Sequence, residues 1–125
     1  MPNAPIISIV DDDESVRVAI KSLLNSMGLI VHIFASAEDF LRSAHVHDTS
    51  CLIVDVQMPS ISGIELQRRL ISQRVHTPII FITAFPEDRI QARALKAGAV
   101  CFLRKPFDEQ TLLRCLEQAL KKSKS

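Results

Sequence analysis

The chain has 125 residues, of which 47% are apolar and 23% are charged, and this is the size and composition of one globular domain with its own core. Lysine and arginine number 15 against 14 acidic residues, and a formal net charge of +1 argues against nonspecific nucleic-acid binding. The N-terminus lacks the basic start and apolar stretch of a secretory signal, and no apolar run reaches membrane-spanning length, so we expect a cytoplasmic protein.

Short apolar runs alternate with segments of helical period along the chain, which indicates βαβ units and a parallel α/β sheet. The runs predicted as strands are 6–10, 30–34, 51–54, 79–82 and 100–103. His32 interrupts the second run, and a strand covered on both faces is normally apolar throughout, so we predict that this run lies at a sheet edge. Right-handed crossovers then favour the doubly wound order 2-1-3-4-5, with the last run at the other edge.

Five helices are expected between and after these strands. Asp13 and Ser36 are predicted to cap the first two, Gly28 and Gly98 to end the first and fourth, and the last three to cover about 63–73, 87–96 and 108–121. The residues expected on buried faces are Val16, Ile20, Leu23, Leu24 and Met27 in the first helix, Phe40, Leu41 and Ala44 in the second, Leu66, Leu70 and Ile71 in the third, and Leu112, Leu116 and Leu120 in the last.

The cysteines are odd in number and lie inside apolar patterns. Cys51, Cys101 and Cys115 also lack the close spacing of metal or redox motifs. We therefore expect all three to be reduced core residues.

Five reactive side chains follow directly after apolar runs: Asp11, Asp12, Asp55, Thr83 and Lys105. Because the carboxyl ends of parallel strands converge on one crevice, we expect these residues to form one site. Each pair of carboxylates at about 4 Å would repel by roughly 1 to 4 kcal/mol, and a hard divalent cation such as Mg²⁺ offsets that repulsion. Asp55 is then the natural nucleophile for a phosphoryl group, with Lys105 neutralising its charge and Thr83 donating a hydroxyl.

Four segments carry motifs at characteristic spacings: Ile-Val-Asp-Asp-Asp at 9–13, Val-Asp-Val-Gln-Met-Pro-Ser-Ile-Ser-Gly at 54–63, Phe-Ile-Thr-Ala at 81–84, and Lys-Ala-Gly-Ala followed by Phe-Leu-Arg-Lys-Pro-Phe at 96–107. Together they span nearly the whole chain, which resembles the receiver domain of bacterial two-component response regulators, the family of CheY and of FixJ-like transcription factors. The fold implied is the flavodoxin-like, CheY-like (βα)5 arrangement.

The resemblance implies that Asp55 accepts a phosphoryl group from the phosphohistidine of a sensor histidine kinase or a phosphotransfer protein. It implies Mg²⁺ bound by Asp12, Asp55 and the backbone carbonyl of Gln57, with Asp11 helping through a water. In such proteins the Lys105-Pro106 bond is commonly cis, which would aim the lysine at the site.

The resemblance also assigns Thr83 and Lys105 to phosphate sensing and Phe102 to an aromatic switch. Relatives with tyrosine there carry a hydroxyl that Phe102 lacks, so its switching would rest on burial and steric fit. Gln57 and Phe85, two residues after Asp55 and Thr83, would shape water access to the acyl phosphate, and a bulky Phe85 would slow its hydrolysis.

The expected output is a conformational change in the fourth helix, the last strand and the last helix. Ile90, Arg93 and Arg104 make this surface a candidate homodimer or effector interface. DNA would be contacted only through an output domain absent from this chain. Residues 1–125 would then be one receiver domain, either a whole protein or the excised N-terminal module of a longer regulator.

Two alternatives remain at this stage. A small phosphatase of the haloacid-dehalogenase type would attack with Asp11 in an Asp-x-Asp signature, but Ser15 stands where a threonine or valine is expected and there is no room for a substrate-binding cap. The other alternative is a receiver-like interaction module that never takes phosphate.

Overall fold

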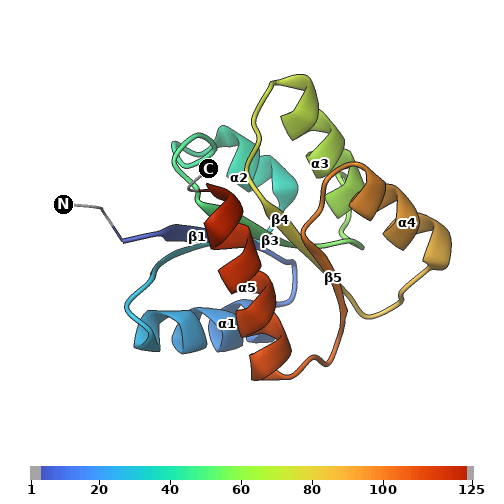
Figure 1. Ribbon diagram of the computed structural model, residues 1–125. Helices are drawn as coiled ribbons and strands as arrows, with labels where there is room; N and C mark the ends of the chain where they lie inside the picture. Colours follow the sequence, from blue (N-terminus) through green and yellow to red (C-terminus); the bar gives the residue numbers. More distant parts are fainter. Residues whose placement is uncertain (1–3, 124–125) are drawn as a thin grey trace.

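All five strands join one parallel sheet in the order β2-β1-β3-β4-β5 in the computed structural model, which describes residues 4–123 (Figure 1). The strands are β1 (Ile6–Val10), β2 (Ile30–Phe34), β3 (Cys51–Asp55), β4 (Ile79–Thr83) and β5 (Cys101–Arg104). This confirms the predicted order, with β2 and β5 at the edges. The first three and last two residues of the expected domain lie outside the described residues.

The helices begin and end close to the predicted positions. They are α1 (Glu14–Ser26), α2 (Ala37–Arg42), α3 (Gly63–Ser72), α4 (Asp88–Lys96) and α5 (Glu109–Ser123). The Asp13 and Ser36 side chains cap α1 and α2. Gly28 and Gly98 follow α1 and α4 with positive φ of 83° and 109°. The predicted N-caps and helix-ending glycines are therefore confirmed. Among residues 4–123, no helix has the length and apolar character that crossing a membrane requires.

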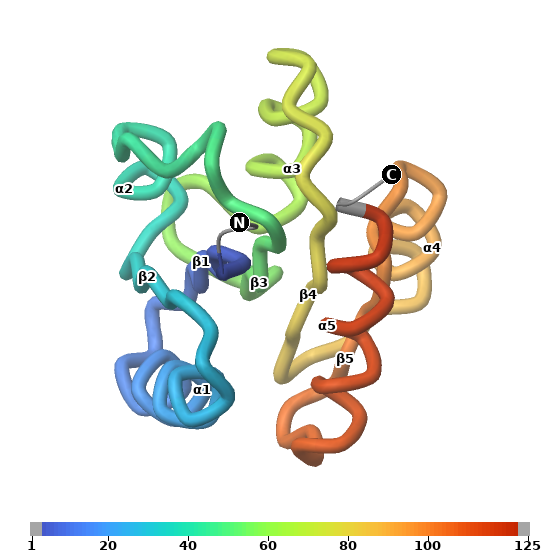
Figure 2. The backbone as a smooth tube through the Cα atoms, turned by 60° about the vertical axis from the view of Figure 1, so that its left-hand side comes forward, coloured from blue at the N-terminus to red at the C-terminus, as the bar shows by residue number. Residues whose placement is uncertain are grey.

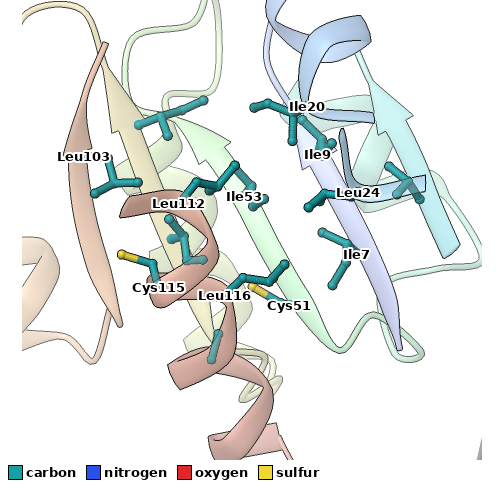
Figure 3. Packing of buried hydrophobic residues seen from close by; sticks show 14 residues of the cluster. Ile7, Ile9, Ile20, Leu24, Cys51, Ile53, Leu103, Leu112, Cys115 and Leu116 are labelled. Carbon is teal, nitrogen blue, oxygen red and sulfur yellow. The ribbon is translucent and has the colours of Figure 1, made fainter. Parts of the chain in front are cut away.

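Two helical layers cover the sheet, and Figures 1 and 2 show α1 and α5 together on one face. Ile7, Ile9 and Ile53 point toward these two helices and pack with Leu24 and Leu116 (Figure 3). The alternate strand residues point to the other face, where they meet α2, α3 and α4. The members of that second cluster include Val10, Leu52, Val54, Phe81, Phe40, Leu66 and Ala94. Burial on both faces explains why the central strands are apolar throughout.

Three residues expected on buried helix faces are exposed. Met27 and Ile71 are 50% and 47% exposed, because each lies in the last turn or cap of its helix, where the chain turns away from the sheet. Ala44 is exposed because α2 ends at Arg42, two residues before it. The Ser43 hydroxyl donates to the Phe40 carbonyl at 2.7 Å and terminates this helix.

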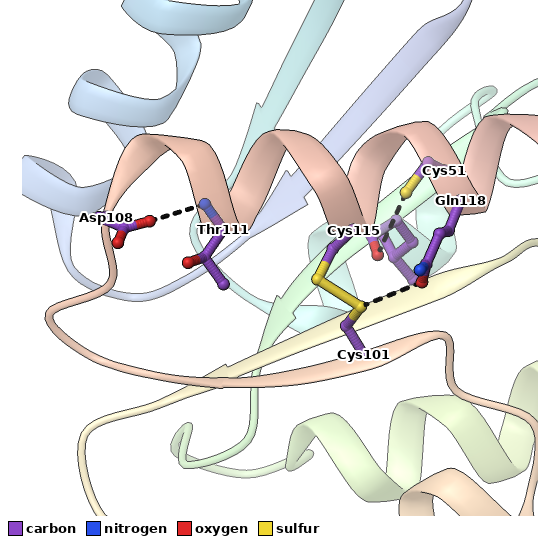
Figure 4. Close-up of a disulfide and its surroundings, with 7 residues drawn as sticks. Cys51, Cys101, Asp108, Thr111, Cys115 and Gln118 are labelled. Carbon is purple, nitrogen blue, oxygen red and sulfur yellow. Dashed lines mark hydrogen bonds between the residues drawn. A yellow bond between two sulfur atoms is a disulfide. The ribbon is translucent and has the colours of Figure 1, made fainter.

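The prediction of three reduced cysteines is wrong for two of them. Cys101 on β5 and Cys115 on α5 form a disulfide, with their Cα atoms 6.0 Å apart (Figure 4). The spacing did not reveal the pair, because α5 runs back over the sheet and brings residue 115 beside the edge strand. Cys51 is free and buried, as expected, and burial raises its pKa to about 12.

The histidine in the edge strand β2 has a specific neighbour. The rings of His32 and His45 stack with their centroids 3.8 Å apart, and His45 Nδ1 lies 3.2 Å from an Asp48 carboxylate oxygen. The loop after α2 therefore covers the middle of this strand, which accommodates a polar residue within it.

Candidate functional site

The reactive side chains lie at the carboxyl edge of the sheet. Asp11 follows β1, Asp55 and Thr83 are the last residues of β3 and β4, and Lys105 follows β5 directly. In an open parallel sheet this edge is where ligands bind. Strands that are far apart in the sequence therefore bring their terminal residues into one crevice.

Asp11, Asp12, Asp55 and Lys105 come together there, and we call these four residues the acceptor cluster. The Lys105 Nζ atom lies 2.9 Å from Asp11 Oδ2 and 3.4 Å from Asp55 Oδ2. Asp11 is fully buried and Asp55 is 5% exposed, so their charges are poorly screened by water. The ammonium thus bridges two carboxylates that would otherwise repel each other.

The three carboxylates of the acceptor cluster also have the arrangement of a cation site. One oxygen from each of Asp11, Asp12 and Asp55 lies within 4.8 Å of the other two. Asp11 Oδ2 is buried and, within residues 4–123, accepts no hydrogen bond, although Lys105 lies at ion-pair distance. Carboxylate oxygens are the ligands that hard divalent cations prefer, so this donor set fits such an ion.

The electrostatic surroundings shift two pKa values in the acceptor cluster. Burial and the neighbouring charge of Asp11 raise the pKa of Asp55 to about 6, although the Lys105 charge and a Gln57 backbone hydrogen bond act in the opposite direction. Burial alone would lower the pKa of Lys105, but its contacts with Asp11 and Asp55 outweigh burial and raise it. At neutral pH Asp55 is therefore an ionised, poorly solvated carboxylate facing an ammonium.

Backbone packing brings the start of α3 against the end of β3. The amide of Gly63, the first residue of α3, donates to the Val56 carbonyl at 3.0 Å. A Cβ atom at residue 63 would overlap the backbone carbonyl of Asp55. Only glycine lets α3 begin this close to Asp55.

The Thr83 hydroxyl is bonded away from Asp55. It donates to Gln57 Oε1 at 2.5 Å and accepts the Phe85 backbone N–H at 3.1 Å. Gln57 Nε2 in turn donates to the Phe85 carbonyl at 3.1 Å. We call these three residues the threonine ring. The sequence drew attention to all three residues, but nothing in it predicted that their hydrogen bonds form a closed ring.

The other residues singled out by the sequence lie nearby. Phe102 on β5 is half-buried, with its ring centroid 6.1 Å from that of Phe81 on β4. Phe85 is 73% exposed beside the threonine ring. The Lys105–Pro106 peptide bond is cis, as expected.

Asp13 has a structural role, because its carboxylate caps α1. Its Oδ1 atom accepts hydrogen bonds from the Ser15 amide at 2.9 Å and the Ser15 hydroxyl at 2.7 Å. The second aspartate of the Asp-x-Asp signature is therefore occupied as the N-cap of α1. The geometry therefore does not favour the phosphatase alternative.

A groove lies beside the acceptor cluster between α1 and α5, with a volume of about 560 Å³. Its walls are mostly apolar and include Val16, Ile20, Leu23 and Phe107. Lys105 is also one of its lining residues. The groove therefore presents an apolar surface next to the carboxylates of the acceptor cluster.

A family model described as "Response regulator receiver domain" matches residues 7–117. Response regulator protein TodT of Pseudomonas putida is 44% identical over 118 residues, which are 94% of this chain and 52% of TodT. The transcriptional regulatory protein FixJ of Azorhizobium caulinodans is 36% identical over 98% of this chain and 58% of its own length. The chain thus spans about half the length of the curated relatives it matches.

Solved structures agree with these relatives. The response regulator StyR superposes with a TM-score of 0.90 and 44% identity, over 97% of this chain and 61% of StyR. The structure titled FixJ-N superposes with a TM-score of 0.84 and 36% identity, over 97% of this chain and 96% of its own length.

Proposed function

Because this chain belongs to the response regulator receiver domain family, we propose that it is the phosphorylation switch of a two-component system, with the Asp55 carboxylate as the phosphoryl acceptor. The observation that carries the assignment to Asp55 is the acceptor cluster, in which a buried carboxylate ending β3 faces the Lys105 ammonium at 3.4 Å. The other acids of the cluster lie close enough to share a cation with it.

The proposed reaction is a transfer from a phosphohistidine to Asp55. An Asp55 oxygen attacks phosphorus, the phosphorus–nitrogen bond breaks, and the imidazole leaves with its electron pair and takes up a proton. Lys105 neutralises charge on the transferred group, which is the main contribution a protein makes to phosphoryl transfer. Because the pKa of Asp55 is about 6, the acceptor is mostly ionised at neutral pH without an added base.

We propose Mg²⁺ as the cation, held by the carboxylates of Asp12 and Asp55 and the Gln57 backbone carbonyl, with Asp11 acting through a water. One oxygen from each of Asp11, Asp12 and Asp55 lies within 4.8 Å of the other two, and this carboxylate set supports the fit. When bound, the cation neutralises the phosphoryl oxygens during transfer.

The donor is a sensor histidine kinase or a phosphotransfer protein, and we propose that it docks in the groove between α1 and α5. The mostly apolar walls of this groove adjoin Lys105, so a helix seated there would bring its phosphohistidine to Asp55. Response regulators generally work in the cytoplasm, and we propose that location for this chain.

The proposed output is a change in α4, β5 and α5 that controls homodimer formation. Thr83 and Phe102 would report the phosphoryl group, and the surface around Ile90, Arg93 and Arg104 would form the contact. TodT and FixJ are regulators about twice as long as this chain, which supports a further output domain through which DNA is bound. Light scattering with and without beryllofluoride tests this part, and an unchanged mass would contradict homodimer control.

The decisive experiment for phosphoryl acceptance is intact-mass measurement after incubation with acetyl phosphate and Mg²⁺. We expect the wild type to gain one phosphoryl group, Asp55→Asn to gain none, and the matched control Asp39→Asn to behave as the wild type. Asp39 is an exposed helix residue paired with Arg42. Uptake by Asp55→Asn would overturn the assignment, and no uptake by the wild type would favour a module that never takes phosphate.

A further inference from the structure

The Thr83 hydroxyl is committed to bonds within the threonine ring. Thr83 is fully buried, and within the described part of the chain no hydrogen bond joins its hydroxyl to Asp55. We propose that the Gln57 carboxamide is a latch that holds Thr83 in the resting state, and that phosphorylation is sensed by competition between this carboxamide and a phosphoryl oxygen. The inference rests on the proposed function and adds a positioning role for the Gln57 side chain.

Hydrogen-bond stoichiometry makes the two states exclusive. A threonine hydroxyl has one proton to donate, and here that proton goes to Gln57 Oε1 at 2.5 Å. To donate to a phosphoryl oxygen on Asp55, Thr83 must release Gln57. A charged phosphoryl oxygen is a stronger acceptor than a neutral amide oxygen, so the phosphoryl group displaces the amide from the Thr83 hydroxyl. The strength of the bond to Gln57 determines how much of the phosphoryl binding energy this exchange uses.

Gln57 is suited to this role because it contacts both halves of the site. Its backbone N–H donates to Asp55 Oδ1 at 3.3 Å, and its side chain bonds both Thr83 and the Phe85 carbonyl. Residues 55, 57, 83 and 85 are therefore linked in one chain of hydrogen bonds. Release of Thr83 also frees the start of the segment that connects β4 to α4.

The position of Gln57 also makes the latch releasable. Gln57 is exposed, so water can satisfy its carboxamide once Thr83 has left. Gln67 provides a contrast within the same chain. It is 3% exposed, and its Nε2 atom donates to the Ala94 carbonyl at 3.1 Å, which is a buried structural bond between α3 and α4.

The test removes the latch with an isosteric change. Gln57→Met keeps the side-chain length but cannot accept the Thr83 proton, and Gln110→Met in α5 is the matched control. Because the sequence holds no Trp or Tyr for fluorescence, binding of beryllofluoride with Mg²⁺ is followed by NMR of the backbone amides. We expect Gln57→Met to bind about fivefold more tightly than the wild type, the factor for one net hydrogen bond, and the control to bind as the wild type.

A double-mutant cycle separates the latch from other effects of residue 57. In a Thr83→Val background the hydroxyl is absent, so Gln57→Met should leave the remaining affinity unchanged. An equal gain in that background, or no gain in the wild-type background, would overturn the latch. If Gln57→Met does not fold, Gln57→Asn serves instead, because its amide is one methylene too short to keep the same bond.

A second measurement needs no phosphoryl mimic. In the resting protein the latch predicts that Gln57→Met changes the Thr83 side-chain rotamer and speeds hydrogen exchange of the Phe85 amide. An unchanged rotamer and exchange rate would overturn the latch even if the wild type takes no phosphoryl group. Failure of phosphoryl uptake alone would instead contradict the proposed function, so the two failures are distinguishable.

Discussion

The acceptor cluster and the threonine ring are neighbours at one sheet edge, but they differ in readiness. In the acceptor cluster, Lys105 already lies within 3.4 Å of the Asp55 carboxylate, so the groups that the proposed transfer uses are assembled. In the threonine ring, the Thr83 hydroxyl is bonded to Gln57 rather than to Asp55. Under the proposed function, phosphoryl transfer would need little rearrangement, whereas its readout by Thr83 would require a hydrogen bond to be exchanged.

The largest expected stability effect comes from removing the ammonium of the acceptor cluster. Breaking a buried ion pair from one side costs about 3 to 5 kcal/mol, and we expect the lower end for Lys105→Met because the Lys105 side chain is 17% exposed. Urea unfolding of metal-free protein at neutral pH measures the loss. Lys96→Met, in the exposed last turn of α4, is the control. If the two variants lose equal stability, the cluster is not held together by its lysine.

Removing the acceptor charge should act in the opposite direction. The folded-state pKa of Asp55 is about 6 and its unfolded value is about 3.9, so the native state holds this proton more tightly than the unfolded state. Ionisation therefore costs folding stability above about pH 6, by at most about 3 kcal/mol, and costs nothing below about pH 4.

We therefore expect metal-free Asp55→Asn to be more stable than the wild type at pH 7 and equal to it near pH 4. Urea unfolding across this pH range measures the difference, with Asp39→Asn as a variant whose effect should not follow that profile. A gain from Asp55→Asn that does not change with pH would contradict the raised pKa.

Addition of Mg²⁺ should strengthen the acceptor cluster and leave the threonine ring in place. A ligand at a hundred times its dissociation constant stabilises the folded state by about 2.7 kcal/mol. We expect this stabilisation to raise the thermal unfolding temperature of the wild type. The rise should be smaller for Asp12→Asn, and K⁺ at equal ionic strength should give none. Equal stabilisation by both salts would show that the carboxylates bind no specific cation.

The smallest stability effect is expected at the edge of the threonine ring. Phe85 is 73% exposed, so Phe85→Ala should change the free energy of unfolding by no more than about 0.5 kcal/mol. The lifetime of the phosphoryl group on Asp55 should nevertheless be shorter in Phe85→Ala, because the phenyl side chain no longer restricts water near the acyl phosphate. Intact mass followed over time after removal of acetyl phosphate measures this, and an unchanged lifetime rules out the shielding role.

Sequence reasoning predicted the features that depend on chain direction and apolar pattern. Asp11, Asp55, Thr83 and Lys105 could be brought together in advance because each ends or follows a predicted strand, and parallel strands share one carboxyl edge. The strand order and the Asp13 cap followed from equally local signals.

What could not be predicted depends on side-chain rotamers and on contacts across elements. The bond from Thr83 to Gln57 requires a particular amide orientation, which no spacing encodes. The pairing of Cys101 with Cys115 requires knowing which strand residue lies beside α5. Met27 and Ile71 fit an apolar stripe, but a periodic pattern does not specify where the helix stops touching the sheet.

The hydrogen atom at the Cα of Gly63 sets a limit on redesign of this protein. Gly28 and Gly98 have open space around the missing side chain, whereas at residue 63 even one methyl group would meet the peptide of Asp55. An alanine there would have to push α3 away from the acceptor strand, although residue 63 carries no charge and performs no chemistry. A mutagenesis library meant to alter signalling while retaining phosphoryl uptake should therefore hold this position constant alongside the acids and the lysine.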